Sequence, residues 1–188
     1  MKKEKGQYGY RNSIRRMRLW ITGILAVAIL AQVLARFLTD NPSAKNILTV
    51  MAILTVLPMA NMASPLLASW RYRTPAETFY QKVQPYESVC VILYDLILTT
   101  KEYVLPMDVI AVHPNGVYAY CTAVKKDKAK AEKSLNDLFT ANRLEPKVKL
   151  IWEENSLWRR LECLKPADSF TDDGTVEYVV SLLKSLSM

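Results

Sequence analysis

Two long apolar runs near the N-terminus constrain this chain more than any other feature. Residues 19–35 contain no charged side chain, and neither do residues 46–70. A helix of about twenty apolar residues spans the hydrocarbon core of a bilayer. Because the polar stretch between the runs is short, the sequence predicts a transmembrane hairpin of two antiparallel helices, at about 19–38 and 44–70.

Positive charge is concentrated before the first run. Residues 1–18 carry seven cations and one acid, whereas residues 71–188 carry sixteen of each. A basic segment beside a membrane helix favours contact with anionic lipid headgroups. The neutral C-terminal part does not favour a nucleic-acid partner. The cations expected to face lipid are Lys2, Lys3, Lys5, Arg11, Arg15, Arg16 and Arg18.

The same charges predict the orientation of the hairpin. Arg71 and Arg73 follow the second run, so both flanks of the hairpin are more basic than its loop. The positive-inside rule then places both termini in the cytoplasm. We therefore expect a multi-pass protein of the cell (inner) membrane, with a cytoplasmic tail at 1–18, a hairpin at 19–70 and a cytoplasmic domain at 71–188.

Polar residues and prolines interrupt the second apolar run at Pro58, Asn61, Ser64 and Pro65. Proline removes a backbone donor and tends to kink a helix. Asparagine within a membrane span usually faces another helix or a cavity. The pattern favours packing inside the hairpin or between copies in a homo-oligomer, with a pore, gate or substrate site as the alternative.

The remaining chain has the pattern of a small α+β domain. Thr74-Pro75-Ala76-Glu77 has the sequence of a helix capping box, and Asn115-Gly116 favours a tight hairpin turn. We expect a mainly antiparallel sheet of about four strands flanked by helices. The expected strands are 89–99, 104–112, 117–124 and 148–152, and the expected later helices are 127–143, 156–164 and 175–186, the last capped by Asp173.

Cysteine and histidine usage predicts no metal site and no cofactor. Cys90, Cys121 and Cys163 have no short spacing, and His113 is the only histidine. Neither a disulfide framework nor a zinc site is therefore expected. We expect Cys90 and Cys121 to be buried on strands and His113 to be a solvated turn residue.

The stretch 107–120, MDVIAVHPNGVYAY, together with the order of the elements, resembles the nuclease-related (NERD) domains of the restriction-endonuclease-like superfamily. That resemblance implies a magnesium-dependent hydrolase in which Asp108 would be the first carboxylate. The Glu-x-Lys positions fall on Cys121 and Ala123, or on Tyr120 and Thr122, which cannot supply the chemistry. The departure predicts the fold without the activity and leaves Asp108 as the only catalytic candidate.

The whole chain also resembles uncharacterised two-span bacterial membrane proteins, a resemblance that implies no activity. We expect a membrane-anchored cytoplasmic binding or scaffold module for an unidentified protein partner, without catalytic function. One alternative is a membrane-tethered, nuclease-like, metal-dependent hydrolase. A second alternative is an oligomeric channel or an accessory transporter subunit.

Overall fold

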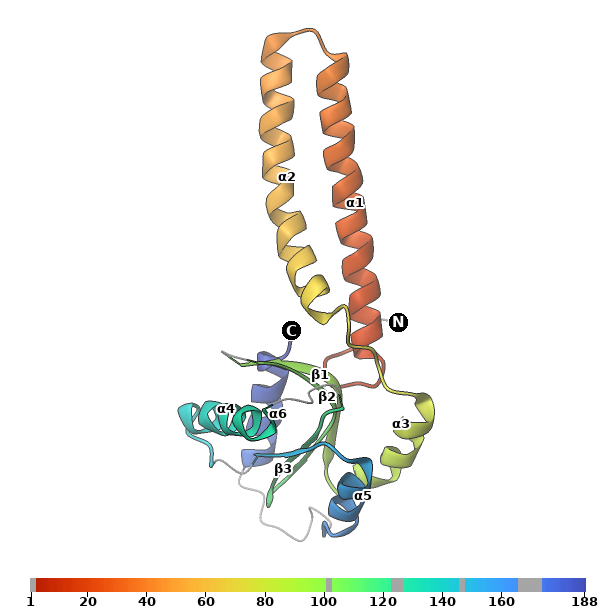
Figure 1. Cartoon of the computed structure of the whole chain (residues 1–188), viewed down its shortest axis with the longest axis vertical. Coiled ribbons are helices and arrows are strands. Elements are labelled where there is room, and N and C mark those ends of the chain that lie inside the picture. Colours follow the sequence, from red (N-terminus) through yellow and green to blue (C-terminus); the bar gives the residue numbers. More distant parts are fainter. Residues whose placement is uncertain (1–2, 101–102, 123–126, 146–147, 166–173) are drawn as a thin grey trace. The chain divides into compact units, whose positions relative to one another are not determined.

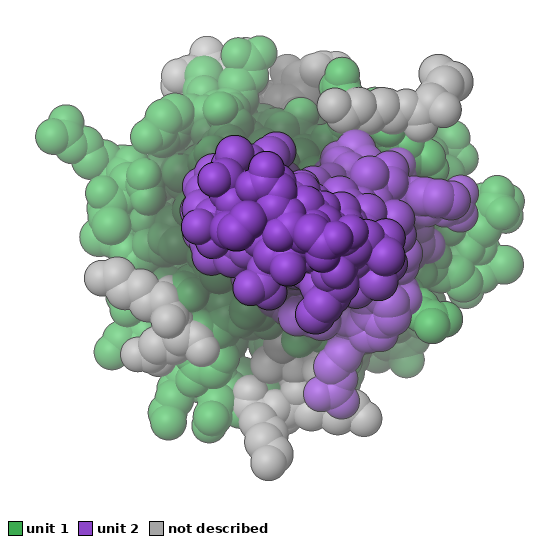
Figure 2. Space-filling view, turned by 90° about the horizontal axis from the view of Figure 1, so that it is seen from above, with its two compact units in different colours: residues 1–11, 72–188 green, residues 12–71 purple. Residues whose placement is uncertain are grey.

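The computed structural model describes residues 3–100, 103–122, 127–145, 148–165 and 174–188. The chain divides into two compact units, coloured separately in Figure 2. The hairpin unit consists of residues 12–71, and the sheet unit consists of residues 1–11 and 72–188. The N-terminal residues up to Arg11 therefore fold with the C-terminal part, which corrects the expected boundary of an independent tail at 1–18.

The hairpin unit is built from α1 (Tyr10–Leu38), whose first two residues belong to the sheet unit, and α2 (Pro42–Ser69). The Asn41 side chain caps α2 by accepting a hydrogen bond from the Ser43 amide at 3.0 Å. The most apolar 18-residue window of each helix contains no buried residue. Both helices are long and apolar enough to cross a membrane, and neither is the core helix of a globular domain.

The sheet unit is α+β, and its sheet is mainly antiparallel, as the sequence predicted (Figure 1). The strands lie in the order β1-β2-β3-β4; β1 and β3 pair antiparallel with β2, and β4 pairs parallel with β3. The elements are α3 (Glu77–Val83), the 3-10 helix η1 (Gln84–Ser88), β1 (Val91–Thr99), β2 (Val104–His113), β3 (Gly116–Tyr120), α4 (Lys128–Ala141), β4 (Val148–Ile151), α5 (Glu154–Glu162) and α6 (Thr175–Leu186).

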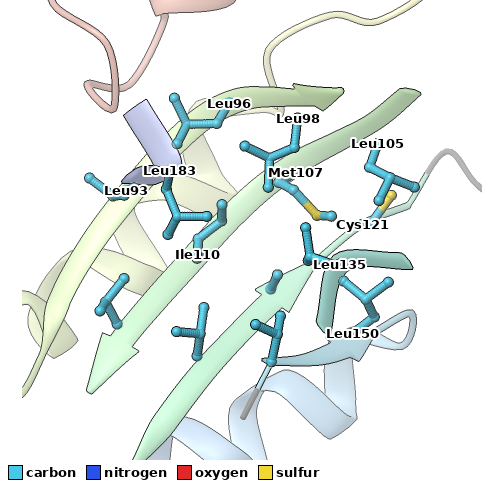
Figure 3. Close-up of a cluster of buried hydrophobic side chains, with 14 of the residues drawn as sticks. Leu93, Leu96, Leu98, Leu105, Met107, Ile110, Cys121, Leu135, Leu150 and Leu183 are labelled. Carbon is cyan, nitrogen blue, oxygen red and sulfur yellow. The ribbon is translucent and has the colours of Figure 1, made fainter. Parts of the chain in front are cut away.

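Helices cover both faces of this sheet. On one face, Leu135 of α4 and Leu183 of α6 pack with apolar side chains of the strands, as Figure 3 shows. On the other face, Val83 of α3 and Leu157 and Leu161 of α5 contribute to a second core. Burial on both faces explains why β1 and β2 are apolar along almost their whole length, without the alternation of a half-exposed strand.

Both edges of the sheet are closed by other parts of the unit. Along β4, the Asn136 side chain bonds both the amide and the carbonyl of Val148, and the Glu132 carboxylate accepts the Leu150 amide. Along β1, Gly6 forms a bridge with Tyr94, and a second bridge joins Leu98 to Ser187. Closed edges protect a sheet against strand addition by other chains.

Three local expectations need correction. Helix α3 begins at Glu77 after Ala76, without a side-chain cap, because the Thr74 hydroxyl bonds elsewhere. Strand β3 ends at Tyr120, before the expected 124. His113 is buried, not solvated. The expected cap at Asp173 lies outside the described residues.

Candidate functional site

The β1–β2 ladder is interrupted at one position, where two aspartates face each other. Tyr94 pairs with Val109 and Leu96 pairs with Met107, but Asp95 and Asp108 between them form no ladder pair. Asp95 has a φ of 58°, in the left-handed region that aspartate tolerates better than most residues. The alternation of side chains between the two faces of the sheet shifts by one residue at this break, and both strands supply apolar side chains to both cores.

The guanidinium of Arg11 occupies this break in the ladder. Its Nη1 atom lies 3.0 Å from Asp108 Oδ1 and donates to the Arg73 carbonyl at 2.7 Å. Its Nη2 atom donates to the carbonyls of Met107 at 2.9 Å and Leu96 at 3.4 Å. Arg11 is 3% exposed, so this ion pair is screened little by solvent. One side chain thus joins the N-terminal segment, both strands and the segment after the hairpin.

Asp95 also contacts the N-terminal segment and the segment after the hairpin. Its Oδ2 atom accepts the Gly9 amide and the Thr74 hydroxyl, both at 2.7 Å. Asp108 is also fully engaged, because Oδ2 accepts the Thr122 hydroxyl at 2.7 Å while Oδ1 contacts Arg11. We call Arg11, Asp95 and Asp108 the root cluster, because it fixes the residues that immediately flank the hairpin in the sequence.

The root cluster buries one more negative charge than positive charge when both carboxyl groups are ionised. Burial raises the pKa of Asp95, while the bonds from Thr74 and Gly9 and the charge of Arg11 act in the opposite direction. The Asp95 Oδ1 and Arg11 Nε atoms are buried without a hydrogen-bond partner. Among the residues described, no cluster of three or more His, Cys, Asp or Glu side chains could hold a metal ion.

These contacts change the interpretation of the basic N-terminal segment. Arg11 was expected to face lipid, and that prediction is wrong because its guanidinium is buried among protein acceptors. Lys5 donates to the carbonyls of Lys184 and Ser187 at the C-terminal end of α6, where a cation complements the helix dipole.

Other cations of this segment have different surroundings. Lys3 donates to the Tyr8 carbonyl at 2.6 Å, and Arg15 lies 4.3 Å above the Trp70 ring within the hairpin unit. Arg16 is exposed, and Arg18 is half-buried. A lipid contact of these residues stays a prediction, and Lys2 lies outside the described residues.

His113 lies at the β2–β3 turn and is 3% exposed. The Asn115 amide donates to its Nδ1 atom at 3.1 Å, so its Nε2 atom carries the proton and donates to the Lys165 carbonyl at 2.9 Å. Beside the turn is a cavity of about 350 Å³ whose lining includes Phe139 and Arg143. Both imidazole nitrogens therefore bond backbone groups, Nδ1 within the turn and Nε2 at the distant Lys165.

The residues expected to pack inside the membrane do not all face the partner helix. Pro58, Asn61 and Ser64 are exposed on α2, and Pro65 is half-buried. Helix α2 continues through both prolines. Polar contact between the two helices comes from Gln32 and Thr55, whose side chains lie 3.4 Å apart.

Sequence reasoning identified Asp108 but missed the other members of the root cluster. One sequence signal for the cluster was available, because each of the two apolar strands contains a single acid, Asp95 in β1 and Asp108 in β2. Two buried acids require a cation. Nothing in the local sequence distinguishes Arg11 from the other six cations before the hairpin.

Comparisons of the chain with protein-family models, with curated proteins and with solved structures find no match. The class of protein is therefore defined by the structure itself: a two-helix apolar hairpin joined to a small α+β sheet unit.

Proposed function

We propose that this chain is a membrane-anchored module that presents its sheet unit as a binding or scaffold surface for a protein partner. The hairpin crosses the cell (inner) membrane twice, and both termini lie in the cytoplasm. The observation that supports the membrane topology in this proposal is that residues 1–11 and 72–188 form one compact unit. Chain segments that fold together lie on one side of a membrane, so the hairpin between them crosses it an even number of times.

The contacts of Asp108 favour a structural role over a hydrolytic one. A magnesium site needs carboxylate oxygens that are free to coordinate the ion. Here one oxygen is paired with Arg11 and the other accepts the Thr122 hydroxyl. Metal binding would require breaking a buried ion pair that also fixes three backbone carbonyls. The candidate catalytic residue of the sequence therefore serves the assembly of the sheet unit.

Photo-crosslinking in intact membranes tests the binding function. A photoreactive residue is placed, one position at a time, at exposed sites of the sheet unit such as Asn115, Asp137 and Tyr178. We expect one discrete protein adduct, formed from neighbouring positions only. Crosslinking that is uniform over the unit, or no protein adduct from any exposed position, would contradict the proposal.

Calorimetry with Mg²⁺ and Mn²⁺ on the full chain tests the hydrolase alternative. We expect no saturable binding that depends on Asp108. Saturable binding that disappears in Asp108→Asn, together with metal-dependent cleavage of DNA or RNA, would replace the scaffold proposal by the hydrolase.

A further inference from the structure

Asn61 is a polar side chain on the outward face of α2. The residues of α2 that are covered in the hairpin include Thr55, Met59, Ala63 and Leu66. Asn61 is two residues from Met59 and two from Ala63, which is about 200° around a helix of 3.6 residues per turn. It therefore points away from α1, and the residue is exposed.

The depth of Asn61 follows from the pairing of the two helices. Gln32 of α1 contacts Thr55 of α2. Asn61 follows Thr55 by six residues, and in an antiparallel pair this places it level with Ala26, six residues before Gln32. Ala26 lies near the middle of the charge-free run 19–35, which is about 25 Å long at 1.5 Å per residue. Asn61 thus lies about 12 Å from either end of that run.

A primary amide at this depth has no water to bond, so it needs a partner that is also in the membrane. A second copy of this chain supplies one. Copies inserted in the same direction carry Asn61 at the same depth, and a two-fold axis along the membrane normal brings the two amides together. Each amide has both a donor and an acceptor, so the pair can form two reciprocal hydrogen bonds.

The neighbouring residues on this face suit such a contact. Leu57, Asn61, Ser64 and Ala68 follow at spacings of four, three and four residues, and all four are exposed. This spacing places them on one stripe of the helix. Ser64 and Ala68 are small, which lets two helix backbones approach closely.

From these observations we infer that the chain forms a two-fold dimer in the membrane through the Asn61 face of α2, with Asn61 bonded to Asn61 of the second copy. This inference rests on the proposed membrane insertion of the hairpin. A dimer would display two sheet units to the partner, which suits a scaffold.

Energy transfer in vesicles of phosphatidylethanolamine and phosphatidylglycerol tests the inference on the full chain. Donor and acceptor dyes are attached to the exposed Cys163, and the vesicles are diluted with lipid. Asn61→Leu should raise the dimer dissociation constant about 10- to 100-fold, from the loss of two membrane hydrogen bonds. The matched control is Asn46→Leu, the same change at an exposed position of the same helix nearer its loop end.

Disulfide trapping gives a second readout that does not depend on affinity. In a Cys163→Ser background, Asn61→Cys should form a dimer on mild oxidation, and Met59→Cys should not. A wild-type chain that floats with vesicles but does not associate would overturn the dimer and leave the proposed membrane anchor intact. Equal changes of the dimer dissociation constant in Asn61→Leu and Asn46→Leu would do the same. A chain that does not float would overturn both proposals.

Discussion

Replacing Arg11 by methionine tests the root cluster most severely, because it removes a buried cation and keeps much of the side-chain volume. The change leaves Asp108 with only the Thr122 hydroxyl, and it leaves the carbonyls of Leu96 and Met107 without their bonds from Nη2. Removing one partner of a buried ion pair costs about 3–5 kcal/mol. We expect a loss of that size in the unfolding free energy of the sheet unit.

Arg16→Met is the matched control for this variant. It removes an equal charge from the same basic segment, but the Arg16 side chain is exposed. Hydrogen exchange of β2 peptides, measured on the full chain in lipid nanodiscs, reports the opening of the sheet. Protection should fall by roughly two to three and a half orders of magnitude in Arg11→Met, and it should change little in Arg16→Met.

A double variant shows whether the charge itself is responsible. Arg11→Met combined with Asp108→Asn no longer buries an unpaired carboxylate at this position. We expect its loss of unfolding free energy to be about 1–3 kcal/mol smaller than the sum of the losses in the two single variants, as for residues in direct contact. Equal protection in Arg11→Met and Arg16→Met, or additive effects in the double variant, would refute the root cluster as a stabilising contact.

Three further outcomes follow from buried groups. Burial raises the pKa of the Cys90 thiol to about 11 and Cys121 is also buried, so maleimide at pH 7 should label only Cys163, as read by mass spectrometry. Burial raises the pKa of Asp95 in the folded state, so the unfolding free energy should decline as pH rises from the ordinary pKa of aspartate through the raised one. In Asp95→Asn, the unfolding free energy measured by urea denaturation at each pH should change less over that interval. Asn136→Ala should destabilise the sheet unit by about 1–3 kcal/mol, because it unpairs an amide of β4, and an unchanged urea midpoint would contradict this.

The elements could be predicted from the sequence where one local signal dominates. The hairpin follows from two apolar runs, and α6 follows from the spacing of Val179 and Leu183. The Thr74 capping box failed because the Thr74 hydroxyl bonds Asp95, 21 residues away, and not its own helix. The solvated turn predicted for His113 is wrong for a related reason, since its Nε2 atom bonds the Lys165 carbonyl, 52 residues away.

The root cluster could not be predicted because its members are joined only by the fold. Arg11 and Asp108 are 97 residues apart, and the hairpin separates them in the sequence. Hydrophobic periodicity reports burial of apolar faces, and it does not report which of several cations meets a buried acid. The outward position of Asn61 could not be predicted for a similar reason, because the exposure of a residue on α2 depends on which face of that helix α1 covers.

Accessibility of engineered cysteines in intact cells tests the central claim, a hairpin that crosses the membrane twice from one folded unit. The native Cys163 is compared with Glu4→Cys in the N-terminal segment and Asp40→Cys in the loop, in a Cys163→Ser background for the latter two. A membrane-impermeant maleimide should label only position 40 in right-side-out spheroplasts, and positions 4 and 163 only after permeabilisation. Labelling of position 4 and position 163 from opposite sides would contradict the account.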